Sequence, residues 1–170
     1  MRPEFIQVGM VVNAHGVRGE VKVNPSLGFD PEFIAEFDTL YIGGQKTEIK
    51  SARVHKSTAL LTLPGVTDMD GALALKGKPV AIRREDAELP EGEYFDEELV
   101  GCTVIDDATG ETVGKVDKVL TYPAHKIYQV KGGGHEYLIP AVPQVFITHI
   151  DPEAEVIRVH MMKGLATDED

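Results

Sequence analysis

The feature that most limits the fold is a regular alternation of short β-prone runs with turn residues along the chain. The runs are rich in Val, Ile and Thr, and several alternate apolar with polar side chains, as half-buried strands do. They fall at 7–12, 20–23, 39–42, 48–54, 59–63 and 80–83, and again at 102–105, 113–120, 126–130, 136–139, 145–150 and 156–160. Pairs such as Gly43-Gly44 and Pro64-Gly65 separate them as turns. The pattern predicts an all-β fold of two small β-barrels, because closing a short-stranded sheet removes its exposed edges.

Two short helices are predicted among the strands. The segment 67–76 begins like a helix cap and ends at Gly77, and a helical turn over 31–37 has Pro31 at its first position. Pro90 and Gly92 mark a linker inside an acidic stretch. We therefore expect an N-terminal barrel over residues 1–84, an acidic linker over 85–93, a C-terminal barrel over 94–167 and a frayed tail at 168–170.

The net charge of −11 conceals a difference between the two halves. Residues 1–84 hold 11 Lys/Arg and 9 Asp/Glu, whereas residues 85–170 hold 6 and 19. The stretch from Glu85 to Glu98 contains eight acidic residues and no basic one. This asymmetry predicts different partners for the two halves. On charge alone, a solvated acidic surface is the simpler interpretation.

The compartment is predicted from what the chain lacks. No apolar run approaches the ~20 residues that span a bilayer, and the first residues lack the apolar core of a signal peptide. The single cysteine, Cys102, cannot form an intramolecular disulfide or a multi-thiolate metal site. We expect a cytoplasmic monomer without membrane association, metal or cofactor.

The segment Asn13–Val23 concentrates two glycines, a histidine and an arginine ahead of a strand. Gly16 and Gly19 are too close together for a phosphate-binding loop that opens a helix, and they are predicted to permit a turn between strands. His15 has a pKa range suited to a general base, but the sequence shows no nucleophile motif or zinc-type histidine pair beside it. We therefore predict a structural turn and no catalytic residue.

Basic residues in the N-terminal half provide a candidate RNA surface. If the strands close into one barrel, several cations can meet there, neutralise phosphates and steer an RNA encounter. The candidate RNA-binding residues are His15, Arg18, Lys22, Arg53, Arg83 and Arg84. Ordinary solvated lysines and arginines remain an equally good interpretation of these positions.

The third candidate is the adjacent aromatic pair Tyr94 and Phe95, which lies within acidic residues. Neighbours on a strand point to opposite faces, so one ring can enter the core while the other stays exposed. Aromatic rings framed by carboxylates suit contact with a basic protein, because the ring anchors and the acids steer. The alternative is that both rings only pack into the second barrel.

Taken together, these segments resemble a known family. Val8–Val23 (VGMVVNAHGVRGEVKV) is similar to the opening signature of the ribosome maturation factor RimM family. The similarity continues in the same order through nearly the whole chain, at 63–68 (LPGVTD), 74–77 (ALKG), 91–101 (EGEYFDEELVG), 137–143 (YLIPAVP), Asp151 and Gly164-Leu165.

The resemblance implies a translation-factor-like N-terminal barrel, a C-terminal PRC-type barrel and a non-enzymatic assembly factor. Its expected partners are precursors of the small ribosomal subunit, ribosomal protein nineteen of that subunit, and the nearby ribosomal RNA of the head. The family's aromatic pair, usually Tyr-Tyr, is linked to ribosome binding and corresponds to Tyr94 and Phe95, where the second hydroxyl is missing. Two alternatives remain: a general PRC-barrel interaction module, and an enzyme with an unrecognised site near His15 and Arg18.

Overall fold

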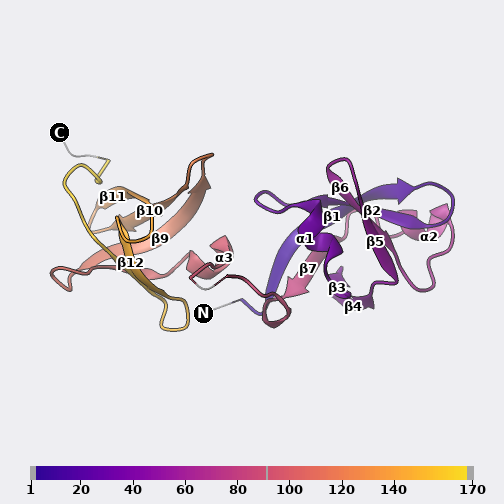
Figure 1. Cartoon of the computed structure of the whole chain (residues 1–170), viewed down its shortest axis with the longest axis horizontal. Coiled ribbons are helices and arrows are strands. Elements are labelled where there is room, and N and C mark those ends of the chain that lie inside the picture. Colours follow the sequence, from indigo (N-terminus) through magenta and orange to yellow (C-terminus); the bar gives the residue numbers. More distant parts are fainter. Residues whose placement is uncertain (1–2, 91, 168–170) are drawn as a thin grey trace. The chain divides into compact units, whose positions relative to one another are not determined.

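The computed structural model describes residues 3–90 and 92–167, and the chain divides into two compact units. The N-terminal unit spans Glu4–Glu88, and the main part of the C-terminal unit begins at Leu89. Strands dominate both units, whereas the helices are few and short (Figure 1). The prediction of an all-β protein with two small barrels is confirmed.

The N-terminal unit is a seven-stranded antiparallel sheet in the order β4-β3-β7-β1-β2-β6-β5. Along β1, Ile6 and Val8 are fully buried while Phe5 and Gln7 are exposed, so the alternation in the sequence follows the pleat. The strands are β1 (Phe5–His15), β2 (Glu20–Pro25), β3 (Thr39–Ile42), β4 (Gln45–Glu48), β5 (Ser51–His55), β6 (Thr58–Thr62) and β7 (Pro79–Arg83).

The sheet closes where its two edge strands meet in the sequence. Only Ile49 and Lys50 separate β4 from β5. The Ile49 N–H donates to the carbonyl of Asp38 at 2.8 Å, and the Lys50 N–H donates to the carbonyl of Thr62 at 2.9 Å. This corner therefore ties the start of β3 to the end of β6. The prediction of one continuous strand over 48–54 is wrong, because the chain turns a corner there that β propensity alone does not reveal.

Two helices lie where helical segments were predicted. α1 (Pro31–Ala35) has Pro31 in its first turn and contacts β2, β5 and β6, with Ile34 fully buried. α2 (Met69–Leu73) is shorter than the predicted 67–76, and the Asp68 side chain caps it by accepting from the Gly71 N–H at 2.8 Å. No helix in the described parts of the chain combines the length and apolar character that crossing a bilayer requires.

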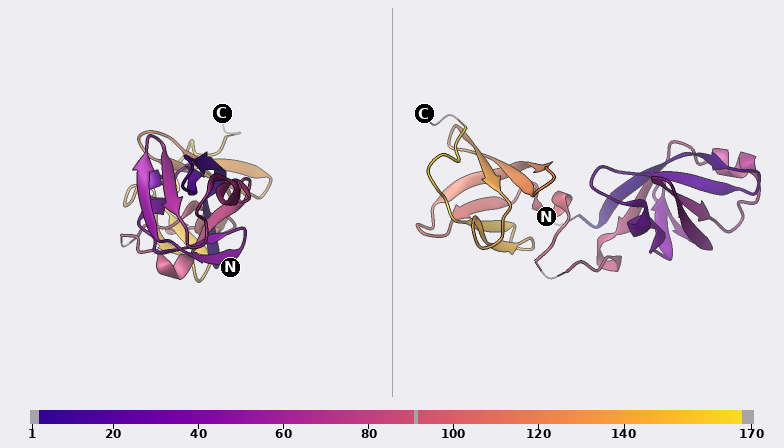
Figure 2. Two further views of the ribbon diagram at one scale, coloured as in Figure 1. Left: turned by 90° about the vertical axis from the view of Figure 1, so that its right-hand side faces the viewer. Right: turned by 45° about the horizontal axis from the view of Figure 1, so that its top comes forward.

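The C-terminal unit is a six-stranded sheet in the order β11-β10-β9-β8-β13-β12, and its strands wrap around their own interior (Figure 2). All neighbouring pairs are antiparallel except β13 and β8, which are parallel. Each of the six strands overlaps one of the predicted runs. They are β8 (Thr103–Asp106), β9 (Thr112–Thr121), β10 (Lys126–Gly132), β11 (His135–Pro140), β12 (Ile147–Asp151) and β13 (Val156–Val159).

The interior of this unit combines β-branched side chains with a close approach of two paired strands. Fully buried side chains include Val104, Val130, Ile139, Ile157 and Val159. Where the paired strands β9 and β10 approach closely, a methyl group at Gly132 would overlap the carbonyl oxygen of Val113. A short helix, α3 (Asp96–Leu99), contacts β9 and places Leu99 in the core.

Candidate binding surfaces on the two units

A hollow of about 390 Å³ opens on the C-terminal unit beside the predicted protein-binding pair. Its rim includes Asp96 and Lys126, whereas its wall is mainly apolar. The wall residues are Tyr94, Leu99, Tyr128, Ala141, Pro143, Ile147 and Ile150, and we call this surface the Tyr94 hollow. Three separate segments of the chain build it: α3 with the residues before it, β10, and the chain from the end of β11 to β12.

Tyr94 and Phe95 occupy different environments. The pair was predicted to be neighbours on a strand, but both residues directly precede α3. Phe95 is the N-terminal cap residue of α3 and has an extended backbone (φ −72°, ψ 147°). Phe95 is only 8% exposed. Tyr94 is half-buried, packs against the core and lines the hollow. Burial thus makes Phe95 a packing residue and leaves the ring of Tyr94 accessible to a ligand.

Three charged residues line the Tyr94 hollow, and two of them, Asp96 and Lys126, compensate each other, whereas Glu93 adds a second carboxylate. Lys126 Nζ lies 2.5 Å from Asp96 Oδ1, so the cation of β10 neutralises the first carboxylate of α3. Burial, with a smaller contribution from the nearby Asp96 carboxylate, raises the pKa of Tyr128 to about 12. Tyr128 therefore stays neutral at physiological pH. An apolar or aromatic side chain suits such a hollow better than a free ion does.

The segment predicted as a glycine turn connects β1 to β2. Gly16 and Gly19 have φ values of +74° and +91°, the region that favours glycine. A side chain at Gly19 would also meet the backbone of the segment before α2, with Asp68 N and Val66 O each at 2.8 Å. Arg18 is exposed between the two glycines.

Three of the predicted RNA-binding residues gather on one face of the N-terminal sheet. His15 pairs with Glu20 across β1 and β2, while Lys22 and Arg53 both pair with Leu60 from opposite sides. Because directly paired residues project to the same side, these side chains share a face. The guanidinium of Arg53 binds Glu20 through two hydrogen bonds of 2.9 Å, so its charge is already matched. Lys22 remains as a cation of this face that is outside that ion pair.

His55 joins this face, although sequence reasoning did not select it. Its ring centroid lies 5.1 Å from that of His15. The pKa of His55 is lowered, mainly by loss of solvent around its ring. Repulsion from neighbouring basic residues lowers it further, and these are His15, Lys56, Arg53 and Lys22. An anion bound here would reverse the effect of the cations. The sequence did contain a signal for His55. Side chains alternate between the two faces of a strand, so positions 53 and 55 of β5 lie on the same face.

Arg83 and Arg84 do not reach this basic face. Arg83 pairs with Phe5 at the start of β1, whereas His15 lies at its end, roughly 30 Å further along the strand. Arg83 contacts Glu4 at 2.7 Å and Glu85 at 3.4 Å. The Arg84 side chain donates to the carbonyl of Ala87 at 3.1 Å. These arginines hold acidic and backbone groups at the other end of the barrel.

The described residues contain no group of three or more His, Cys, Asp or Glu side chains placed to hold a metal ion. Cys102 is buried, and burial raises the pKa of its thiol, which disfavours the reactive thiolate. The carboxylate closest to His15 in the strand pairing, Glu20, is engaged by Arg53. The geometry near His15 and Arg18 thus favours charge contacts over proton transfer.

Most of the Tyr94 hollow was not predicted from the sequence. The Lys126–Asp96 pair joins residues thirty positions apart, and Tyr128, Ile147 and Ile150 read only as strand residues. Two signals were available, because the segments 91–101 and 137–143 both carried part of the family resemblance and both contribute to the lining. Folding is required to bring the remaining residues to one surface.

The architecture defines a class of protein: an all-β protein with two small barrels. Comparison with known families identifies the particular type. Residues 6–87 match the RimM N-terminal domain, and residues 96–165 match the RimM PRC barrel domain. The chain belongs to the RimM family.

Three relatives illustrate the extent of the similarity. The ribosome maturation factor RimM of Geobacillus kaustophilus is 38% identical over 169 residues, covering 95% of both chains. That of Lactobacillus delbrueckii subsp. bulgaricus is 35% identical over 165 residues, covering 95% of this chain and 98% of the relative. A RimM crystal structure from Pseudomonas aeruginosa is 27% identical, covers 93% and 98% of the two chains, and has a TM-score of 0.45.

Proposed function

We propose that this protein is a cytoplasmic ribosome maturation factor that binds immature small ribosomal subunits and promotes processing of their RNA and maturation of the head. The observation that carries the proposal is the half-exposed ring of Tyr94 over an apolar hollow, in a chain whose relatives are named ribosome maturation factors. The protein acts as a monomer and by binding: it stabilises the correctly folded intermediate relative to competing conformers.

The Tyr94 hollow is the proposed contact for ribosomal protein nineteen of the small subunit. An aromatic or aliphatic side chain of that basic protein fits the wall formed by Tyr128, Ile147 and Ile150, while the acidic residues of α3 attract its cations. Phe95 contributes by holding the segment before α3 in place, because its ring is buried.

The basic face of the N-terminal unit is the proposed contact for ribosomal RNA of the head. Lys22 and the turn residue Arg18 supply the available charge, and the rings of His15 and His55 lie on the same face as Lys22. Arg53 takes part less, because Glu20 already neutralises it. Arg83 and Arg84 are structural in this proposal.

The test is co-sedimentation of the purified protein with immature small subunits, alongside direct titration with ribosomal protein nineteen. Loss of a central aromatic anchor typically costs about 2 kcal/mol, so Tyr94→Ala is expected to weaken both interactions by about thirtyfold. Tyr94→Phe retains the ring and is expected to bind well. Tyr122→Ala is the matched control, because Tyr122 is an exposed tyrosine that does not line the hollow. A folded Tyr94→Ala variant that binds like the wild type would disprove the contact.

The RNA contact has its own measurement, the dependence of particle affinity on salt. Replacing a phosphate-binding cation lowers the slope of log affinity against log salt by about 1, so Lys22→Gln is expected to have this effect. Arg53→Gln provides the comparison, and its slope is expected to change less because of Glu20. Equal slopes for Lys22→Gln and the wild type would exclude phosphate contact by Lys22.

A further inference from the structure

The N-terminal unit carries an aromatic row that none of the surfaces above uses. Phe29, Phe33 and Phe37 are spaced four residues apart along and around α1. The ring centroids of Phe29 and Phe33 lie 5.8 Å apart, and those of Phe33 and Phe37 lie 5.1 Å apart in an edge-to-face arrangement. All three side chains are half-exposed. Spacing by four residues places them on one side of the helical turn.

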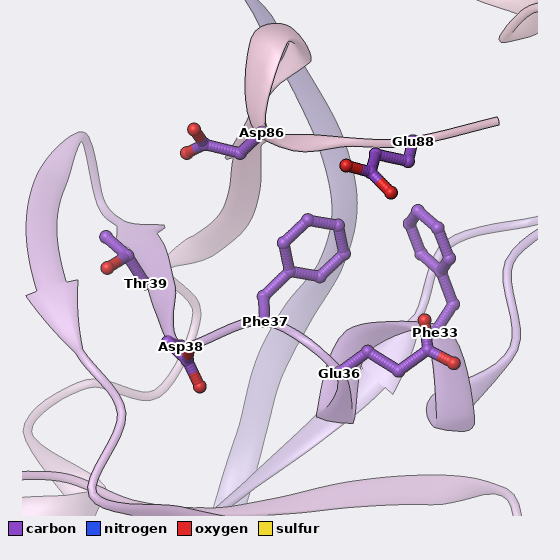
Figure 3. A pocket seen from close by; sticks show the side chains of 7 residues that line it. All are labelled: Phe33, Glu36, Phe37, Asp38, Thr39, Asp86 and Glu88. Carbon is purple, nitrogen blue, oxygen red and sulfur yellow. The ribbon is translucent and has the colours of Figure 1, made fainter.

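Two of these rings form one side of a hollow of about 470 Å³. The opposite side is the segment after β7, where Asp86 and Glu88 flank the buried Ala87. Figure 3 shows the rings of Phe33 and Phe37 pointing toward this segment, with Glu36 and Asp38 on the α1 side. We call this surface the Phe33 hollow.

The negative charges around the Phe33 hollow are not neutralised by salt bridges within the part of the chain that the structure describes. Glu36, Asp38, Asp86 and Glu88 are all exposed. Among residues 3–90 and 92–167, no Lys, Arg or His forms a salt bridge with any of these four carboxylates. Arg84, which lies in the same turn, directs its side chain to the Ala87 carbonyl. Four negative charges therefore lie beside two half-exposed aromatic rings.

We propose that the Phe33 hollow binds an arginine- or lysine-bearing segment of a basic polypeptide. A guanidinium stacked on Phe33 or Phe37 gains cation–π attraction, and the surrounding carboxylates accept its hydrogen bonds. The same carboxylates repel phosphate, so the surface selects against nucleic acid. The proposal does not depend on the Tyr94 hollow, because both walls of the Phe33 hollow belong to the N-terminal unit.

The probe is a short labelled peptide of alternating arginine and glycine, blocked at both ends, titrated into the full chain. Amide chemical shifts are expected to change mainly at residues 33–39 and 86–88, and anisotropy gives the affinity. Removing both charges with Asp86→Asn and Glu88→Gln is expected to weaken binding by about fivefold to tenfold. Phe37→Leu keeps the apolar bulk but removes the π face, and a loss of about threefold is expected.

The matched control carries the same change in charge elsewhere. Asp70→Asn with Glu111→Gln alters two exposed carboxylates outside the hollow, and its affinity is expected to stay within about twofold of the wild type. Tyr94→Ala is also expected to leave the peptide affinity unchanged, which separates this site from the proposed ribosomal contact. Equal losses in the two double variants would overturn the proposal, as would equal binding of a glutamate–glycine peptide, or a short RNA that shifts the amides of residues 33–39 and 86–88 more than the arginine peptide does.

Discussion

The Tyr94 hollow and the Phe33 hollow each combine two aromatic rings with carboxylates, yet their charges are arranged in opposite ways. In the Tyr94 hollow, Lys126 neutralises Asp96, Glu93 is the one further carboxylate, and the rest of the wall is apolar. In the Phe33 hollow, no described cation forms a salt bridge with the four carboxylates. The first surface therefore suits an apolar side chain, whereas the second suits a cation. Similar residue types produce different specificities because of which charges are already paired.

The largest expected effect is a loss of stability in one unit only, which would remove the Tyr94 hollow and leave the Phe33 hollow intact. In Gly132→Ala, the new methyl group overlaps the backbone of β9, so we expect the C-terminal unit to lose about 4 kcal/mol or more of stability. Hydrogen exchange is expected to show the C-terminal strands opening while the peptide affinity of the Phe33 hollow persists. Gly133→Ala is the control: Gly133 has φ +60° with open space around it, and a cost of about 1 kcal/mol is expected. Wild-type protection in Gly132→Ala would contradict the close approach of β9 and β10 at this glycine.

Substitutions at Phe95 and Tyr94 distinguish a packing role from a binding role at the Tyr94 hollow. Phe95→Ala removes a buried ring and is expected to destabilise the C-terminal unit by about 3 kcal/mol. Tyr94→Ala removes a half-exposed ring, so a smaller loss of stability is expected together with the larger loss of binding. Urea unfolding followed by amide exchange measures the stabilities. If Tyr94→Ala proved as destabilising as Phe95→Ala, the ring of Tyr94 would be a packing element.

Alkaline pH is expected to affect the Tyr94 hollow through Tyr128. Its pKa rises from 10.0 to about 12 on folding, so the folded state retains a proton that the unfolded state releases. The resulting stability is present below pH 10 and is lost as the pH rises toward 12. The two-unit difference in pKa corresponds to roughly 3 kcal/mol. Unfolding measured from pH 9 to 12 is expected to show this loss in the wild type, and Tyr128→Phe should lack that component. Parallel pH profiles would refute the burial of the hydroxyl.

The smallest expected effect concerns salt. Salt screens contacts between exposed charges. The ratio of the peptide affinity of the wild type to that of Asp86→Asn/Glu88→Gln is therefore expected to fall by about threefold from low to high salt. The ratio of the wild-type affinity for ribosomal protein nineteen to that of Tyr94→Ala is expected to stay nearly constant, because an aromatic contact is insensitive to ionic strength. Anisotropy titrations at matched salt concentrations measure both ratios. If both ratios fell together, the two hollows would share an electrostatic mechanism.

Much of the fold was predicted from signals that are local in the sequence. Period-two alternation, turn residues and the family signature predicted two barrels and nearly every strand, because these signals depend on residues close together in the sequence. The prediction failed at 48–54, where Ile49 and Lys50 bond to distant carbonyls and split one expected strand into two. It also failed at Tyr94 and Phe95, whose rings were assigned to opposite faces of a strand, because both residues directly precede the helix Asp96–Leu99. Both failures lie where tertiary contacts outweigh local propensity.

The sequence by itself determined the all-β class, the two-unit organisation, the glycine turn and membership of the RimM family. Only the tertiary structure decided which charges are available for binding. It paired Arg53 with Glu20 and Lys126 with Asp96, and it placed four carboxylates around Phe33 and Phe37. Composition counts charges, but the energy of each charge depends on distances of a few ångströms between residues far apart in the chain. Those distances exist only after the strands have closed.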